Sequence, residues 1–61
     1  MIYWVAADGN GEVFLYEDKP ILGNGHWQPT GHRWYKISPR LFPNVTYENS
    51  PMKIEINIME E

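Results

Sequence analysis

The sequence contains no cysteine, so disulfide bonds and thiolate chemistry are excluded. No apolar run approaches the ~18 residues that a membrane span needs. The opening residues 1–4 form neither a basic n-region nor an apolar h-region, and we therefore expect no signal peptide and no membrane anchor. Together, these absences predict a cytoplasmic protein.

The chain is also short: its 61 residues predict a single domain over residues 1–61. A domain of this size buries only about 60% of the surface that its unfolded chain exposes, so we expect marginal stability. Such small domains usually add a disulfide, a metal, a partner subunit or large core side chains. Aromatic residues make up 15% of the chain, and an aromatic-dense core is one way to hold it together.

Charge is limited overall but unevenly distributed. The formal net charge is −3. Residues 1–18 contain four acids and no Lys or Arg, residues 19–43 contain four Lys or Arg and no acid, and residues 44–61 contain four acids and one Lys. The middle of the chain is therefore a basic segment between acidic flanks, which is a reason to consider an anionic partner.

The residue types that are present predict β structure. Residues 2–7 are rich in aromatic and β-branched side chains and look apolar on both faces, which predicts a central strand. The sequence Asp8-Gly9-Asn10-Gly11 supplies the positive φ angles of a tight turn. Residues 12–17 predict the returning strand, so we expect residues 2–17 to form a hairpin.

The middle of the chain predicts shorter elements. Pro20 cannot donate a ladder hydrogen bond, so residues 20–22 form at most a short edge strand. Residues 26–28 predict a short strand and residues 32–37 a longer one, with a turn at residues 29–31 between them. We expect these two strands to pair as a second hairpin.

A single helical turn is expected after this hairpin, at about residues 39–42. Ser38 can cap its N-terminus, and Pro39 suits the first helical position. Pro43 disfavours helical geometry at the residue before it and closes the segment. Two apolar side chains of this turn are expected to plug one end of the core: Leu41 and Phe42.

The clearest alternation of apolar and polar residues lies at residues 53–59, which predict a half-buried antiparallel strand with three isoleucines on its buried face. The whole chain therefore predicts a mainly β domain. We expect a small antiparallel sheet or an SH3-like barrel of four to five strands with one short helical turn. Such a fold is compatible with many unrelated functions.

The turn at residues 8–12 resembles the start of a calcium loop, which needs Gly at its sixth position and Glu at its twelfth. These positions are Val13 and Lys19. The only histidines, His26 and His32, are too few for a metal site, which needs three or four ligands. We therefore expect no metal and no other cofactor.

Groups suited to catalysis are also explained by structure. A nucleophile needs an adjacent base, whereas Ser38 is interpreted as a helix cap and Ser50 as a turn residue. Residues 44–46 match a glycosylation sequon, which we interpret as structural because no signal peptide is expected. A chain this small has little room for a pocket of a few hundred Å³. We predict that the protein is not an enzyme and has no small-molecule substrate.

The basic segment combines cations with aromatic side chains. On an alternating strand, Trp34 shares one face with His32 and Lys36, while Tyr35 and Ile37 point to the core. Trp34 is then an exposed aromatic among cations, and Trp and Arg are enriched at interface hot spots. The candidate binding residues are Trp27, His32, Arg33, Trp34, Lys36 and Arg40.

Two classes of function fit this segment. The first is a non-enzymatic binding module for a protein partner or for a second copy of the chain. The second is nucleic-acid binding through residues 26–40, which the acidic net charge disfavours. A plain structural interpretation also stands: so small a domain needs its tryptophans in the core, and the cations are a solvated strand face.

Both ends of the chain resemble small uncharacterised proteins of gut-bacterial genomes and their prophages. The similarity lies in residues 41–51, Ile54 and Glu55, and in Tyr3, Val5, Ala6, Asp8, Gly11, Leu15, Tyr16, Lys19 and Pro20. The resemblance implies no activity and no functional residues. It implies a cytoplasmic accessory protein of bacterial or phage origin that acts by binding, with a phage-encoded inhibitor of a host protein as a third candidate function.

Overall fold

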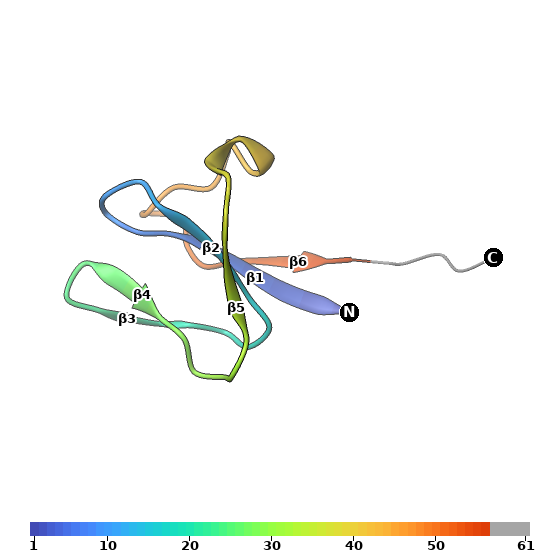
Figure 1. The fold of residues 1–61 in the computed structure, drawn as a ribbon. Helices are drawn as coiled ribbons and strands as arrows, with labels where there is room; N and C mark the ends of the chain where they lie inside the picture. The colour runs from blue at the N-terminus through green and yellow to red at the C-terminus, as the bar shows by residue number, and fades with distance from the viewer. Residues whose placement is uncertain (57–61) are drawn as a thin grey trace.

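The computed structural model describes residues 1–56, which form a mainly β fold with one 3₁₀ turn (Figure 1). This confirms the predicted fold class. The elements are β1 (Ile2–Ala7), β2 (Val13–Tyr16), β3 (Ile21–Gly23), β4 (His26–Gln28), β5 (Trp34–Ile37), η1 (Pro39–Leu41) and β6 (Met52–Glu55).

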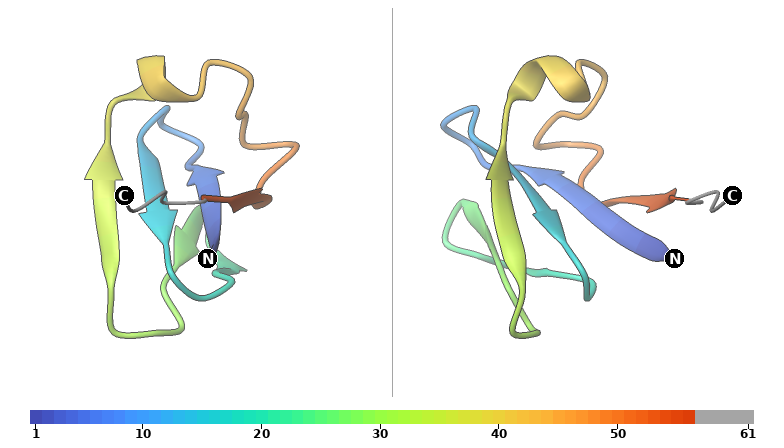
Figure 2. Two further views of the ribbon diagram at one scale, coloured as in Figure 1. Left: turned by 90° about the vertical axis from the view of Figure 1, so that its right-hand side faces the viewer. Right: turned by 45° about the vertical axis from the view of Figure 1, so that its right-hand side comes forward.

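The strands are arranged in two antiparallel sheets. Four of them form a sheet in the order β5-β2-β1-β6, and β3 and β4 form a separate two-stranded sheet. Among the described residues, β5 and β6 each have one neighbour, so the larger sheet is open rather than closed into a barrel (Figure 2). Residues 1–56 contain six strands, more than the four to five expected.

The predicted first hairpin is confirmed. Strands β1 and β2 pair from Trp4 opposite Tyr16 to Ala7 opposite Val13. In the turn, the Gly11 amide donates to the Asp8 carbonyl at 3.0 Å, and the Asp8 amide donates to the Glu12 carbonyl at 2.8 Å. Gly11 has a φ of +90°, a conformation that glycine adopts without steric cost. β1 lies inside the sheet, as its two apolar faces predicted.

The predicted second hairpin is wrong. β4 pairs with β3, and β5 pairs with β2. The physical reason is the Asn24-Gly25 turn, in which both residues have positive φ, at +46° and +83°. Two such residues form the type I′ loop whose twist matches that of antiparallel strands. Residues 29–33 instead carry the chain from this hairpin to the edge of the larger sheet.

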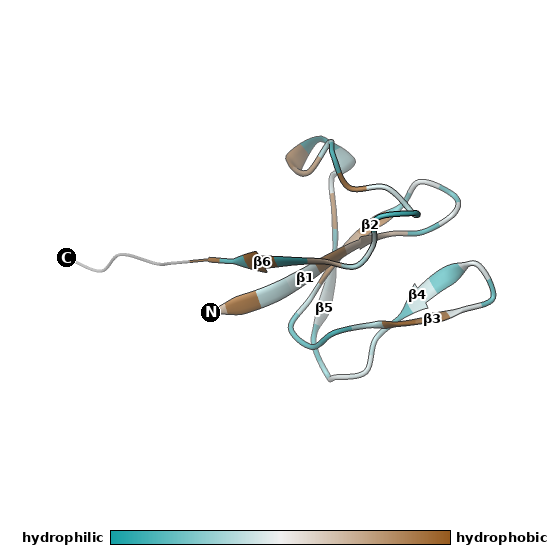
Figure 3. Cartoon of the chain, turned by 180° about the vertical axis from the view of Figure 1, so that it is seen from behind, coloured by the Kyte–Doolittle hydropathy of each residue, from teal (hydrophilic) through white to brown (hydrophobic). Residues whose placement is uncertain are grey.

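One face of the larger sheet carries the core cluster of Val5, Ala7 and Val13. The chain between β5 and β6 crosses this face and packs Phe42 and Val45 against the cluster. Figure 3 shows the apolar stretches of β1 and β2 at the centre of the sheet. One further apolar residue of β2, of β5 and of β6 also packs against it: Leu15, Ile37 and Ile54.

The 3₁₀ turn confirms its predicted capping. The Ser38 hydroxyl accepts from the Arg40 amide at 3.2 Å, and Pro39 opens the turn. Phe42 ends the turn in a non-helical conformation, with φ of −136°, and packs on the core as expected. Leu41, in contrast, is 65% exposed, so its expected core role is wrong. A single short turn directs only one of two consecutive side chains toward the sheet.

The loop after the turn is fixed by its own side chains. Thr46 and Asn49 exchange hydrogen bonds, with the Thr46 amide donating to Asn49 at 2.7 Å. The Ser50 hydroxyl donates to the Thr46 carbonyl and accepts from the Ala7 amide at 2.8 Å. The Ser50–Pro51 peptide bond is cis. The last strand, expected at residues 53–59, is β6 over Met52–Glu55, and residues 57–59 lie outside the described residues.

The opposite face of the sheet is covered by the β3–β4 hairpin. The Trp27 amide donates to the Asp8 carboxylate at 2.7 Å, and the Tyr16 hydroxyl donates to the Trp27 carbonyl at 3.4 Å. The Lys19 ammonium lies 5.3 Å from the centre of the Trp4 ring. The sheet is therefore packed between this hairpin on one side and the connection from β5 to β6 on the other.

Candidate functional site

β5 is an edge strand, and the register shows which of its backbone groups are free. The Glu17 amide donates to the Arg33 carbonyl at 3.3 Å, so residues 33, 35 and 37 are the ones that face β2 in the ladder. In an antiparallel pair, alternate residues point their N–H and C=O groups to opposite sides. The backbone groups of Trp34 and Lys36 therefore point away from the sheet, toward the open edge.

The two aromatic side chains of β5 are both exposed. Trp34, for which the sequence left exposure and burial open, is 45% exposed, and it lies opposite Tyr16 on the face that carries the β3–β4 hairpin. Tyr35 lies on the core face, as expected, but is 48% exposed, so its predicted burial is wrong. The physical reason is its place on the edge strand, where only β2 flanks it.

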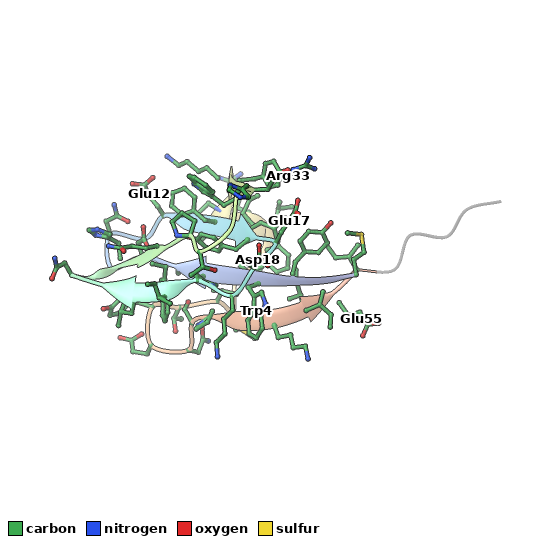
Figure 4. All side chains as sticks on the ribbon, turned by 90° about the horizontal axis from the view of Figure 1, so that it is seen from below. Trp4, Glu12, Glu17, Asp18, Arg33 and Glu55 are labelled. Atoms are coloured by element: carbon green, nitrogen blue, oxygen red, sulfur yellow. The ribbon has the colours of Figure 1, made fainter. Side chains whose placement is uncertain are left out.

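The candidate cations lie in β5 or in the segments directly before and after it. His32, Arg33, Lys36 and Arg40 are all exposed. In Figure 4, Arg33 lies at the β5 edge of the sheet and Glu55 at the opposite, β6 edge. We define the β5 surface as His32, Arg33, Trp34, Tyr35, Lys36 and Arg40 together with the open backbone edge.

Lys36 forms the one ion pair within residues 1–56, at 2.8 Å from the Glu12 carboxylate. Lys36 lies opposite Phe14 in the register, and Phe14 follows Glu12 by two residues on the same face of the sheet. The ion pair therefore runs diagonally from β5 to the residue just before β2. The hydrogen bond from Lys36, followed by one from Asn10, holds the pKa of Glu12 below its usual value. Both groups are solvent-accessible, so the pair positions Lys36 more than it stabilises the fold.

Trp27, the remaining candidate residue, is placed differently. It is partly buried in β4, and its main chain fastens the hairpin to Asp8 and Tyr16. Its indole N–H is buried and has no hydrogen-bond partner among the described residues. The structural interpretation therefore holds for Trp27 but not for Trp34. His26, in the same strand, is exposed.

Two features of the site were not predicted from the sequence. The first is the exposure of Tyr35, and the second is the open backbone edge at Trp34 and Lys36. Both depend on β5 pairing with β2 alone. The Asn24-Gly25 dipeptide was the available signal, because a strong hairpin turn between β3 and β4 leaves β5 to find another partner.

The other open edge of the four-stranded sheet is β6. The Met1 ammonium donates to the Ile56 carbonyl at 2.9 Å, and the Ile56 amide donates back to Met1 at 2.8 Å. By the same alternation, Lys53 and Glu55 are the β6 residues whose backbone groups point outward. Both open edges of the four-stranded sheet thus carry a lysine at an outward position, but of these two strands only β5 carries exposed aromatic side chains.

We also examined residues 1–56 for a metal site and for a membrane-spanning helix. Residues 1–56 contain no group of three or more His, Cys, Asp or Glu side chains arranged to hold a metal ion. Nor does that part contain a helix with the length and hydropathy to cross a membrane. The expectations of no cofactor and no catalytic activity stay predictions.

Comparison with known proteins adds no information about function: no protein family model, curated protein or solved structure matches this chain.

Proposed function

We propose that this protein is a non-enzymatic binding module that engages a protein partner, either another chain or its own second copy, through the β5 surface. The observation that carries the proposal is the pair of adjacent aromatic residues, Trp34 and Tyr35, each nearly half exposed on an open edge strand. Edge strands recruit extended segments through their free backbone groups, while neighbouring side chains provide specificity.

The residue types on this surface support the same function. Trp, Tyr and Arg are the types that most often dominate binding energy at protein interfaces. The β5 surface brings one of each together at Arg33, Trp34 and Tyr35, and all three are exposed. A cytoplasmic location and a bacterial or phage origin remain part of the proposal on the sequence alone.

Site-specific photo-cross-linking tests this function. A benzoyl-phenylalanine placed at position 34 samples the β5 surface, and the same residue at position 53 samples the opposite edge as a matched control. We expect protein adducts from position 34 and few from position 53, with adducts lost when Arg33→Glu is added. Equal labelling at both positions, or no protein adduct, would contradict the proposal.

The identity of the cross-linked protein distinguishes binding to a different chain from self-association. A cross-link to an unrelated chain indicates a heterologous partner, and a cross-link to the same chain indicates self-association. Inhibition of a host protein by a phage-encoded chain is a narrower form of the first outcome. It requires that the captured partner loses activity when the purified protein is added.

Nucleic-acid binding is the second candidate function. It is favoured by one observation: Trp34 is exposed, and the four basic or histidine side chains of the β5 surface are exposed as well. Against it, Lys36 is already paired with Glu12, and the net charge is −3. Titration of labelled single- and double-stranded oligonucleotides at two salt concentrations tests it. Salt-sensitive binding that Arg40→Glu removes and Lys53→Glu retains would favour this function over protein binding.

A further inference from the structure

We propose that the occupant of the β5 edge is a second copy of this chain, paired antiparallel to β5 across a two-fold axis at Tyr35. This inference rests on the proposed binding function of the β5 surface and specifies its partner. It follows from the register of β5, from the order of its side chains and from the exposed aromatic area of Trp34 and Tyr35.

The free backbone groups set the pairing. On the open edge, only Trp34 and Lys36 present outward N–H and C=O groups. An antiparallel two-fold at Tyr35 places Trp34 opposite the partner's Lys36, and Lys36 opposite the partner's Trp34. Each of these pairs exchanges two backbone hydrogen bonds, so every free group of β5 between its ends is satisfied and the two sheets become one.

The side chains match in the same register. Tyr35 meets the partner's Tyr35 at a non-hydrogen-bonded position, where side chains approach most closely and aromatic pairs are favourable. On the other face, the Lys36 stem lies against the partner's Trp34. The Lys36 side chain is 67% exposed even though its ammonium lies 2.8 Å from the Glu12 carboxylate, so its apolar stem is accessible to the indole ring.

The β6 edge is the competing surface for a second copy. A two-fold at Ile54 would place Lys53 opposite the partner's Glu55, which also matches in charge. However, exposed ion pairs contribute little to association. Ile54 already packs against the core cluster, whereas Trp34 and Tyr35 keep nearly half their surface exposed. The exposed aromatic area therefore favours β5.

The surface area that the dimer would bury sets its expected affinity. A large aromatic side chain buries roughly 150–250 Å², so the half-exposed rings of two Trp34 and two Tyr35 side chains would bury roughly 400 Å² on pairing. With the flanking side chains and backbone, the interface stays below the ~1,200 Å² of stable complexes. We therefore expect a weak dimer, with a dissociation constant on the order of 100 µM.

Sedimentation equilibrium of the purified chain from about 10 µM to about 1 mM measures this constant. Tyr35→Arg should abolish the dimer, because it sets two guanidinium groups against each other at the two-fold axis. Leu41→Arg is the matched control, since it also replaces an exposed apolar side chain but lies outside β5. A chain that stays monomeric throughout overturns the proposal, as does a dimer that Tyr35→Arg leaves intact.

Single cysteines test the register directly, because the chain has none of its own. At position 35, the two Cα atoms would lie about 4.5 Å apart, within the roughly 4.4–6.8 Å that a disulfide spans. At position 34, the diagonal offset separates them by more than about 7 Å, too far for a disulfide. Under mild oxidation, Tyr35→Cys should form dimers and Trp34→Cys should not. Cross-linking at position 34 instead of 35 overturns the register.

Backbone methylation by total synthesis compares the two edges without changing side chains. N-methylation of the Lys36 amide removes an outward donor from β5, and N-methylation of the Lys53 amide does the same at β6. We expect only the first to weaken the dimer at least tenfold. The reverse result overturns the assignment to β5.

Failure of this inference is distinguishable from failure of the proposed function. A monomeric purified chain whose position 34 still cross-links to a different protein refutes the dimer and retains the binding function. A monomeric chain without any adduct at position 34 refutes both.

Discussion

At the scale of single residues, Tyr16 shows how the β3–β4 hairpin is held. Its side chain is 2% exposed, and its hydroxyl donates to the Trp27 carbonyl. Burial, followed by the nearby Asp8 charge, raises the pKa of Tyr16 to about 12 from 10.0. The neutral phenol is therefore the form that the folded chain stabilises.

This pKa has a consequence for stability. Because the folded pKa is raised, the contribution of Tyr16 is fully present below pH 10 and is lost as the pH rises through about 12. Urea unfolding of the wild type and of Tyr16→Phe at several pH values measures it. The difference in the free energy of unfolding should be largest at neutral pH, at about 1 kcal/mol, and should shrink or reverse by pH 12. A difference independent of pH would contradict the assignment.

Ser50 is a second residue whose side chain completes the sheet. It accepts from the amide of Ala7, a residue that is 4% exposed and lies beyond the end of the β1–β6 ladder. Ser50→Ala would leave this amide buried without a partner, at a cost of about 1–3 kcal/mol. Ser38→Ala removes an exposed capping hydroxyl and should cost about 1 kcal/mol or less. Urea unfolding compares the two variants, and equal losses would refute the role of Ser50.

At the scale of elements, the β3–β4 hairpin is a separate sheet that depends on a few polar contacts. Asp8 accepts from the Trp27 amide at 2.7 Å, and the Gly9 amide donates to the Gly25 carbonyl at 3.2 Å. An added Cβ at Gly9 would lie 3.2 Å from that carbonyl oxygen, which is closer than ordinary contact. The turn of the first hairpin therefore also serves as the attachment site of the second.

Asp8→Ala should consequently loosen one element and leave the other in place. We expect hydrogen exchange of amides in β3 and β4 to accelerate at least tenfold, while amides shared by β1 and β2 change little. Asn10→Ala, in the same turn but without a bond to the hairpin, is the control. Uniform acceleration across both sheets in Asp8→Ala would show that they unfold together.

The sequence predicted local elements better than their partners. The β1–β2 hairpin and the capped turn after Ser38 depend on adjacent residues, and both were predicted correctly. The pairing of β4 depends instead on which of two turns forms a hairpin, the one at Asn24-Gly25 before β4 or the one at residues 29–31 after it. Asn24-Gly25 prevails because both residues adopt positive φ, whereas Pro29 lacks an amide to donate.

In the candidate site, too, local features were predicted from the sequence and features that depend on strand order were not. Alternation along residues 32–37 correctly predicted that Tyr35 shares a face with the core, but it left open whether Trp34 is exposed or buried. It could not predict that Tyr35 is half exposed, because burial on that face depends on whether another strand lies beyond β5. Strand order arises from contacts between distant segments, which periodicity within one segment does not contain.

At the scale of the whole molecule, the described chain has few fully buried side chains. Its core cluster contains three buried residues, and Val5 is the one large side chain of residues 1–56 that is completely inaccessible. A chain of this kind has little stability to spare, and association of folded copies would add to it.

The melting temperature should therefore depend on protein concentration. For a domain of this size, each kcal/mol gained corresponds to about 4–8 °C. Between low and high micromolar concentration, we expect the calorimetric midpoint of the wild type to rise by a few degrees, whereas that of Tyr35→Arg stays constant. A midpoint that rises equally in both would mean that association uses another surface.

The pairing of β1 with both β2 and β6 also bears on how the chain folds. The β1–β2 pairing closes across one tight turn, but the β1–β6 pairing joins Ile2 to Glu55, almost the full length of the described chain. Closing the longer loop costs more chain entropy before any contact compensates for it. The first hairpin should thus form early and β6 should dock last. Substitutions in the Asp8–Gly11 turn would then mainly slow refolding, and substitutions in β6 would mainly accelerate unfolding.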